Sequence, residues 1–426
     1  MLFAFLAGLF GFIFLGVPIA FSLIMTAVIL MLLSSGVVTP AIIAQSIVRG
    51  IDSFPIMAIP FFMLAGEIMN VGGISKRIVY FSKELVGHVT GGIGYVAVVA
   101  SMIFAGVSGS AVADTSAIGS ILLPIMDKEG YDRKKSTALV VSAGCIGPII
   151  PPSIPMILFG VIGGVSIVKL FLGGIVPGVL IGIGLMTVWY FHAKKHNYKS
   201  SEKATLKSII KSGREAFWAL LLPIIILGGI IFGIYTPTEA AVIAVVYSFV
   251  ISTFVYKEFK PHHWLNVLVT SGKTTAVVML VCGSATAAGY LITTARIPEL
   301  LSNTILSIAN NNVTLVMLLI NILLLAVGCV MDLTPALLIL GPILLPIALS
   351  YGLDPVYFGV VMCVNLCIGL ITPPVGTVLF VGCGLSKLSM AELTKPILGF
   401  IGVMVFVLLL ITYIPGLVTF IPNLVK

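Results

Sequence analysis

The sequence predicts an all-α polytopic membrane protein built from two inverted repeats. Of its 426 residues, 59% are hydrophobic and only 9% are charged, whereas soluble domains carry about 25% charged residues. Apolar stretches of membrane-spanning length recur along the chain, and a Pro-containing pattern returns 222 residues later, from Pro124 to Pro346. This composition excludes a soluble globular enzyme, a disordered chain and a coiled coil.

Ten stretches are long enough to cross a bilayer, which takes about 20 apolar residues. Five lie in residues 1–215 and five in 216–426, the two predicted repeats: 2–16, 18–33, 52–72, 137–163 and 168–191, then 216–235, 238–256, 267–295, 357–384 and 397–417. Two further apolar regions, 91–126 and 313–348, are too long for one helix and contain small and polar residues in their middle. Each is predicted to be a re-entrant helical hairpin. Because five is odd, the second half must be inserted upside down relative to the first.

The distribution of basic residues supports this orientation. Basic residues collect in cytoplasmic loops. If the connector 192–215 is cytoplasmic, 19 of the 23 Lys and Arg residues fall on that side, and both termini lie on the other. The net charge of +8 is therefore a topology signal. The connector is expected to be a solvated link between the halves, partly a helix that lies on anionic lipid, and nucleic-acid binding is not expected.

The repeat also duplicates two interruptions in apolar segments. Crossings 137–163 and 357–384 are broken by Gly147-Pro148-Ile149-Ile150-Pro151-Pro152 and by Gly369-Leu370-Ile371-Thr372-Pro373-Pro374. Proline lacks an N–H group and clashes with the carbonyl one turn earlier, so each run unwinds its helix. Freed carbonyls at mid-membrane depth are costly unless they line a cavity or bind something. Carbonyls and hydroxyls suit a small hard cation, and helix N-termini suit an anion. The alternative is that the prolines only kink packed helices.

Four acidic residues lie in apolar segments, where ionisable groups usually serve a function. Asp114 and Asp332 lie at the predicted hairpin tips and are candidates for a cation or substrate site; N-capping of the following helix is the alternative for both. Glu67 and Glu239 are expected to have structural roles, in an ion pair or at the membrane interface.

The sequence does not favour an enzyme. Gly106-Val107-Ser108-Gly109 matches the nucleophile motif of intramembrane serine proteases, but a serine nucleophile needs an activating base. All five His residues fall in predicted cytoplasmic loops. His192 and His196 lack a third ligand for a metal, and no nucleotide-binding loop occurs. The six Cys residues are interpreted as small apolar thiols. No enzyme activity and no cofactor are expected.

The duplicated hairpins, the Gly-x-x-x-Pro-Pro breaks, the run Pro60-Phe61-Phe62-Met63-Leu64-Ala65-Gly66 and the Leu-Leu-Pro-Ile repeats resemble the large membrane (M) subunit of tripartite ATP-independent periplasmic (TRAP) transporters, the DctM/SiaM type. The resemblance covers essentially the whole chain. It implies an elevator-type transporter of the bacterial inner membrane with periplasmic termini. It further implies sodium coupling, a periplasmic substrate-binding protein and a small membrane (Q) subunit. Because Met1 opens directly into the first crossing, that subunit is expected on a separate chain.

The resemblance also places candidate sites by position. The family's sodium sites lie where each hairpin tip meets a broken helix. The first would use Ser108, with Ser110 as a further candidate, and the carbonyls of Gly147, Ile150 and Pro152; the second would use Asp332 and Thr334 with Gly369, Thr372 and Pro374. The substrate carboxylate would lie between the tips, near Ser110, Asp114, Ser116, Ser153 and Thr377.

The resulting hypothesis is sodium-coupled uptake of an acidic organic solute, of the sialic acid or C4-dicarboxylate type. The nearest alternative is a sodium/carboxylate transporter of the same superfamily that works without a binding protein. A gated channel and an intramembrane hydrolase are the alternatives from other classes. The outward loops, including 296–312, are the expected contacts for the binding protein.

Overall fold

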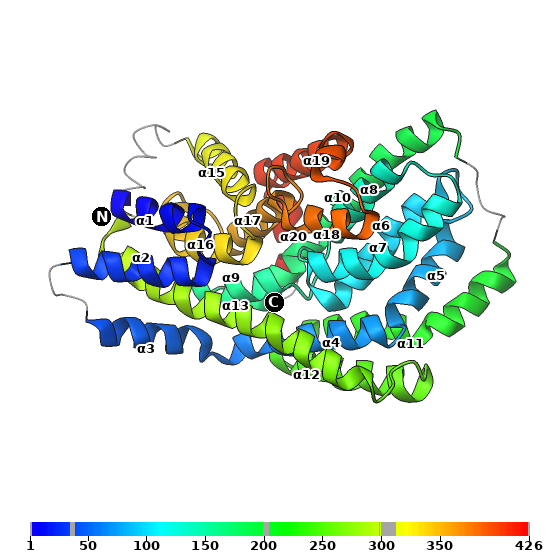
Figure 1. The fold of residues 1–426 in the computed structure, drawn as a ribbon, viewed down its shortest axis with the longest axis horizontal. Helices are drawn as coiled ribbons and strands as arrows, with labels where there is room; N and C mark the ends of the chain where they lie inside the picture. The colour runs from blue at the N-terminus through cyan, green and yellow to red at the C-terminus, as the bar shows by residue number, and fades with distance from the viewer. Residues whose placement is uncertain (1, 35–38, 199–203, 298, 300–311, 425–426) are drawn as a thin grey trace.

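The computed structural model describes residues 2–34, 39–198, 204–297, 299 and 312–424, and the elements in these ranges are helical (Figure 1). The expected binding-protein loop 296–312 lies mostly outside them. The first half contains α1 (Leu2–Phe14), α2 (Ile19–Leu33), α3 (Pro40–Ile51), η1 (Phe54–Met57), α4 (Ala58–Val71), α5 (Ile74–Val86), α6 (Gly92–Ser108), α7 (Ala111–Lys128), α8 (Arg133–Gly144), α9 (Ile154–Gly163) and α10 (Ile167–Lys195). The second contains α11 (Leu206–Ile231), α12 (Pro237–Val250), η2 (Ile251–Val255), α13 (His263–Thr294), α15 (Val313–Gly328), α16 (Leu333–Ser350), α17 (Pro355–Gly369), α18 (Thr377–Ser386), α19 (Met390–Tyr413) and α20 (Gly416–Leu424).

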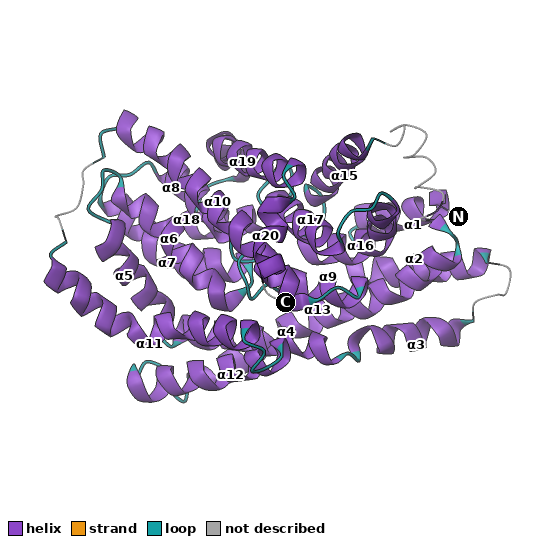
Figure 2. Cartoon of the chain, turned by 180° about the vertical axis from the view of Figure 1, so that it is seen from behind, coloured by secondary structure: helices purple, strands orange, loops and turns teal. Residues whose placement is uncertain are grey.

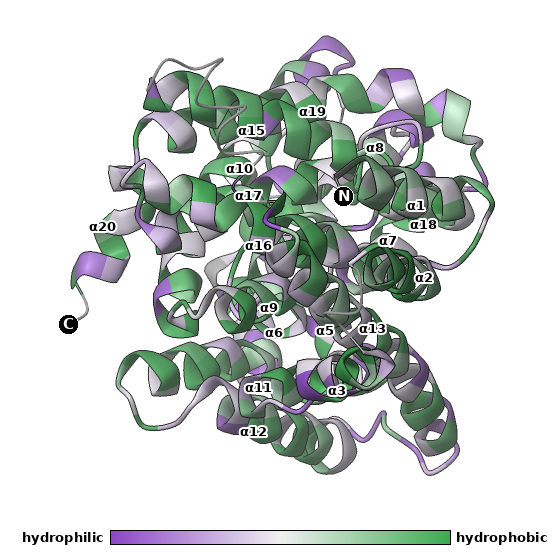
Figure 3. Cartoon of the chain, turned by 90° about the vertical axis from the view of Figure 1, so that its left-hand side faces the viewer, coloured by the Kyte–Doolittle hydropathy of each residue, from purple (hydrophilic) through white to green (hydrophobic). Residues whose placement is uncertain are grey.

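The helices have the length and the surface of a multi-span membrane protein. Seven segments in the described part are long and apolar enough to cross a bilayer: 54–71, 167–195, 207–231, 237–255, 263–294, 333–350 and 390–413. Most of the helices are coloured as hydrophobic in Figure 3. Many large apolar side chains are exposed, among them Phe14, Phe232 and Phe406. A hydrocarbon environment makes such exposure favourable, because the lipid tails solvate these side chains.

Both expected helix pairs are present, with turns at the predicted places. Helices α6 and α7 pack against each other across a two-residue turn, and α15 and α16 do so across a longer one. The first turn is tight because Gly109 adopts a positive φ of 61°, which glycine tolerates. Ser110 then caps α7, since its Oγ accepts a hydrogen bond from the Ala113 N–H.

Both expected interrupted helices are also present. The first consists of α8 and α9 and the second of α17 and α18, and each contains a cis Pro–Pro bond, Pro151–Pro152 or Pro373–Pro374. Helices of 10 to 15 residues rise about 15 to 22 Å at 1.5 Å per residue. This is well short of the hydrocarbon thickness of about 30 Å, so each break lies inside the fold. The N-terminal halves begin at Asp132 and Asp354, both of which cap with the side chain.

The connector 192–215 is partly helical, as expected, because α10 continues to Lys195 and α11 begins at Leu206. The short helix α3 precedes the predicted crossing 52–72 and was not expected. With the 222-residue offset, α3, η1 and α4 together correspond to the continuous helix α13. The difference arises at Ser53-Phe54-Pro55, where the proline starts a 3₁₀ turn in the first half only.

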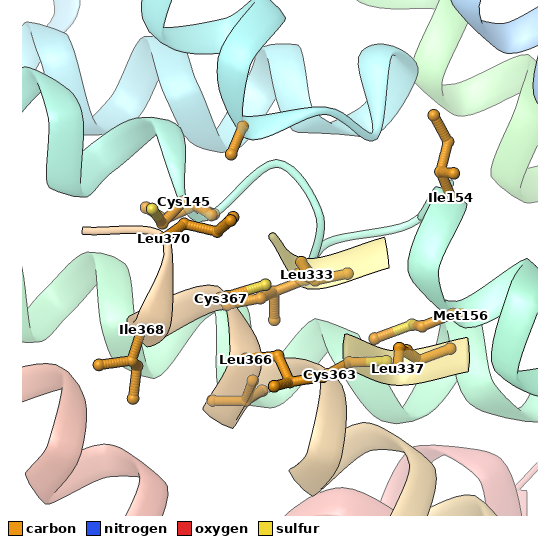
Figure 4. Packing of buried hydrophobic residues seen from close by; sticks show 14 of the residues in the cluster. Cys145, Ile154, Met156, Leu333, Leu337, Cys363, Leu366, Cys367, Ile368 and Leu370 are labelled. Atoms are coloured by element: carbon orange, nitrogen blue, oxygen red, sulfur yellow. The ribbon is translucent and has the colours of Figure 1, made fainter. Parts of the chain in front are cut away.

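The helices form two layers (Figures 1 and 2). The scaffold layer, α1–α4 and α11–α13, is held together by packing of α13 on α2, α3 and α4 and of α12 on α4. The hairpin layer, α6–α10 and α15–α20, contains reciprocal contacts, since α7 packs on α18 and α9 packs on α16. Helix α5 packs against α6 and α11, one from each layer. Figure 4 shows the core where the halves meet, with Met156 of α9, Leu337 of α16 and Cys363 of α17 in one buried cluster.

Candidate functional site

A cavity of about 470 Å³ lies where the two layers meet. On the hairpin side it is lined by both hairpin tips and both helix breaks, and on the scaffold side by α4 and α13. The lining residues are Phe62, Met63, Gly66, Glu67, Asn70, Ser108, Gly109, Ser110, Ala111, Val112, Ala113, Ser116, Pro148, Ile154, Pro155, Thr270, Ser271, Thr274, Val278, Asp332, Leu333, Thr334 and Leu370. The duplicated features of the sequence therefore converge on one cavity.

The first tip is built around Ser108 and Asp114. Ser108 ends α6 and is buried; its Oγ donates a hydrogen bond to Oδ1 of Asp114 and accepts one from the Ser110 N–H at 3.3 Å. Asp114 lies in the first turn of α7 and is fully buried. A Cβ added at Gly147 would lie 2.2 Å from Asp114 Oδ2. Glycine at 147 therefore allows the first helix break to approach the carboxylate closely.

Several oxygen atoms at this first tip have no hydrogen-bond donor in the described part of the chain. Asp114 Oδ2 is buried and unpartnered, and the carbonyls of Gly147, Ile150 and Pro152 accept no hydrogen bond there. Burying an unpaired carboxylate oxygen is costly, and a carboxylate cannot donate. In its ionised form, Asp114 therefore needs a hydrogen-bond donor or a cation beside Oδ2. A site formed by a carboxylate, a hydroxyl and carbonyl oxygens has the chemistry of a hard alkali-type cation site.

The second tip uses a different set of contacts. Asp332 occupies the N-cap position of α16, and its Oδ1 accepts a hydrogen bond of 2.9 Å from Thr377 Oγ1 of α18. The Val375 N–H donates to the Cys329 carbonyl at 3.3 Å, which ties the second break to the hairpin turn. Thr372 Oγ1 donates to the Ile368 carbonyl at 2.7 Å. The carbonyls of Thr372 and Pro374 accept no hydrogen bond among the described residues, and the Gly369 carbonyl accepts one, from the Thr372 N–H.

The structure divides the predicted site residues into those that line the cavity and those that lie behind it. The first group is Ser108, Ser110, Ser116, Asp332 and Thr334. Behind the lining, Asp114 contacts the first tip, Thr377 contacts Asp332, and Ser153 caps α9 by accepting from the Met156 N–H. Asp114 is not the N-cap of α7, because Ser110 occupies that position. Asp332 does occupy the N-cap position of α16, but its side chain forms no capping hydrogen bond.

Sequence reasoning missed the scaffold side of the cavity, formed by Glu67 and Asn70 of α4 and by Thr270, Ser271 and Thr274 of α13. Glu67 was expected in an ion pair or at the interface, but it lines the cavity and has no ion pair in the described part of the chain. The spacing of polar residues along the sequence could have indicated this side of the cavity. Residues three or four apart share a helix face, so Glu67 with Asn70, and Thr270 with Thr274, mark polar stripes on apolar helices. Glu239 instead completes a capping box with Thr236.

The fold places the chain among all-helical, multi-span membrane proteins. Its structure is similar to that of the YdaH transporter of Alcanivorax borkumensis, with a TM-score of 0.65, 13% sequence identity and coverage of 87% of each chain; at this identity the similarity concerns the fold alone. The chain belongs to the tripartite ATP-independent periplasmic transporter family, DctM component, whose sequence profile matches residues 6–417.

Two relatives illustrate the range of that family. The chain is 44% identical over 414 residues to the 2,3-diketo-L-gulonate TRAP transporter large permease protein YiaN of Escherichia coli, with 97% of each chain covered. It is 39% identical over 419 residues to the sialic acid TRAP transporter large permease protein SiaM of Vibrio cholerae, with 98% of this chain and 97% of that one covered. The chain is therefore a transporter permease and not an enzyme.

Proposed function

We propose that this permease carries out sodium-coupled secondary active uptake of an acidic organic solute, of the sialic acid or C4-dicarboxylate type, across the bacterial inner membrane. The observation that carries the proposal is the buried, unpartnered Asp114 carboxylate oxygen beside free carbonyls at a helix break. The family assignment supports the organic-acid class, since its members include permeases named for diketogulonate and for sialic acid.

Two sodium sites form where the tips meet the breaks. The first is made by Ser108, Asp114 and the carbonyls of Gly147, Ile150 and Pro152. We assign Asp114 to this sodium site, and no longer to the substrate site, because its carboxylate faces Gly147. Ser110 remains a candidate through its position at the turn. The second is made by Asp332, Thr334 and the carbonyls of Gly369, Thr372 and Pro374, with Thr377 holding the Asp332 carboxylate.

The substrate carboxylate binds between the tips. The first turns of α7, α9 and α16 line the cavity, and helix N-termini favour anions. Sodium bound directly behind these turns adds positive charge, so the binding of substrate and that of sodium favour each other. Ser110 and Ser116 line the same space.

Transport follows the elevator scheme. The hairpin layer slides against the scaffold layer, with the halves 1–215 and 216–426 inverted in the membrane and both termini periplasmic. Each positive charge moved inward gains about 2.3 kcal/mol per 100 mV, so two sodium ions with one monovalent anion make uptake electrogenic. Sodium drives the cycle only if it favours the substrate-competent tips.

The proposed partners are a periplasmic substrate-binding protein and a small membrane subunit on a separate chain. The second candidate function is a sodium/carboxylate transporter of the same superfamily that needs no binding protein. The observation that favours it is that both hairpin tips and both helix breaks line one cavity within this single chain.

Reconstitution tests both functions. Proteoliposomes containing this chain and its small subunit should accumulate the acid under an inward sodium gradient only when the binding protein is added. Accumulation without the binding protein would favour the alternative, and uptake that ignores the sodium gradient would contradict both.

A further inference from the structure

The two walls of the cavity differ in chemistry. The hairpin wall presents the first turns of α7, α9 and α16, which suit a carboxylate. The scaffold wall presents Glu67, Asn70, Thr270, Ser271 and Thr274. Its oxygen atoms are mostly hydrogen-bond acceptors, or hydroxyls that can both donate and accept. The described lining residues include no Lys, Arg or His. An acid bound between these walls meets a carboxylate site at one end and a hydroxyl-binding surface at the other.

Glu67 is the charged group of the scaffold wall. Its side chain is half-buried on an apolar helix, and within the described residues it forms neither an ion pair nor a side-chain hydrogen bond. A carboxylate in this position is costly unless something donates hydrogen bonds to it. Asn70, one turn further along α4, also faces the cavity without a hydrogen-bond partner in the described part of the chain.

The polar wall is not an inherited feature of the duplicated fold. The residues 222 positions after Glu67 and Asn70 are Gly289 and Ile292. Gly289 lines a second cavity of about 440 Å³, between α3, α13, α9 and α16, whose lining contains no carboxylate in the described chain. Of these two cavities, only the one that contains the hairpin tips has a carboxylate and an amide in its described lining.

We infer that the carried solute is a polyhydroxylated monocarboxylate, of the sugar-acid type, and that Glu67 and Asn70 select it by accepting hydrogen bonds from its hydroxyl groups. The inference rests on the proposed function and specifies its substrate. A dicarboxylate would place its second charge against Glu67, where no basic residue of the described lining compensates it, so repulsion disfavours it. An unhydroxylated acid would leave the half-buried Glu67 carboxylate without donors, which a site built for hydroxyls penalises.

The test measures ligand binding by the permease itself, so that the binding protein does not impose its own specificity. The permease with its small subunit is placed in nanodiscs, and the thermal stability is recorded with and without sodium. The probes are aldonic acids of four to nine carbons, unbranched dicarboxylates of the same lengths, and the matching plain monocarboxylates. We expect saturable, sodium-dependent stabilisation by members of the aldonic series alone.

Variants assign the effect to the scaffold wall. Glu67→Gln should raise the aldonic acid concentration for half-maximal stabilisation about tenfold, because one charge-assisted hydrogen bond is lost. The same variant should allow a dicarboxylate of similar length to bind. Asn70→Ala should weaken the aldonic acid without admitting the dicarboxylate. The control Glu129→Gln changes an exposed glutamate after α7 and should alter neither.

The outcomes separate this inference from the proposed function. Sodium-dependent stabilisation by dicarboxylates in the unmodified permease, or aldonic acid binding that is unchanged in Glu67→Gln, would overturn the substrate class and leave sodium coupling standing. Stabilisation by sodium with no response to any aldonic acid would also overturn the substrate class. Loss of every sodium effect would instead count against the proposed function.

Discussion

At the scale of single residues, the proposed cation sites depend on two aspartates that occupy different positions in the repeat. Asp332 corresponds to Ser110 by the 222-residue offset, and Asp114 corresponds to Ala336. Each half therefore supplies one carboxylate, held by a different hydroxyl: Ser108 for Asp114 and Thr377 for Asp332. The sequence predicts that both acids lie near the tips. It could not separate their roles, because the approach of Asp114 to Gly147 depends on how α7 packs on α8.

The substitution Asp114→Asn tests the first cation site. It keeps the shape of the side chain but removes the charge that faces Gly147, so sodium-driven uptake should fall at least about a hundredfold while the protein still inserts and folds. The control Asp127→Asn makes the same change at the far end of α7, in a partly exposed ion pair with Arg133, and should have little effect. Uptake that keeps its sodium dependence in Asp114→Asn would remove this residue from the site.

The substitution Thr377→Val tests the second site. It deletes the hydroxyl that donates to Asp332, so the sodium concentration for half-maximal uptake should rise about tenfold, the effect of losing a hydrogen bond to a charged group. Thr394→Val is the control, because its hydroxyl donates only to the Met390 carbonyl in its own helix. Equal sodium requirements in the two variants would show that Thr377 has no part in ion binding.

At the scale of helices, hydropathy and proline positions predicted the hairpins and the broken helices to within a few residues. Those features are local, since Pro-Pro runs interrupt a helix wherever they occur. Helix α3 was missed because it is short and carries Gln45 and Arg49, so no membrane-spanning run marks it.

A close backbone-to-backbone approach joins the second hairpin to the second broken helix. A Cβ added at Gly369 of α17 would lie 2.6 Å from the Gly328 Cα of α15, against backbone that cannot move aside. Gly369→Ala should therefore destabilise the protein by about 1–3 kcal/mol, the usual cost of overpacking, seen as a lower unfolding temperature in detergent. The control Gly402→Ala in α19 has open space around it and should be neutral or slightly stabilising. Equal unfolding temperatures for the two variants would contradict the packing described.

At the scale of the whole molecule, the fold is two layers with the candidate site between them. The 222-residue repeat predicted which helices correspond, and the reciprocal packing of α7 on α18 and of α9 on α16 fits that correspondence. The spacing marks a polar stripe on each of two helices, but it could not show that the stripes form one wall. Glu67 and Thr274 line the same cavity only because α4 and α13 pack side by side, although the two residues are 207 positions apart in sequence. The orientation of the termini stays a prediction from the basic residues.

Cross-linking tests whether the layers slide. In a background without the six native cysteines, Gly289→Cys with Pro342→Cys joins the scaffold helix α13 to α16 of the hairpin layer, where an added Cβ at 289 would lie 3.9 Å from Pro342 Cγ. Oxidation should abolish uptake and reduction should restore it. Gly119→Cys with Leu385→Cys joins α7 to α18 within the hairpin layer, and its oxidation should leave uptake intact. Full activity of the oxidised interlayer pair would exclude an elevator movement between these layers.

The most direct test of the central claim follows both solutes in one experiment. Radioactive sodium and labelled acid are measured together in proteoliposomes that contain the permease and its small subunit, with the binding protein outside. The account predicts that sodium enters only together with the acid, in a fixed ratio above one, and that Asp114→Asn abolishes both fluxes. Accumulation of the acid without any accompanying sodium would contradict it.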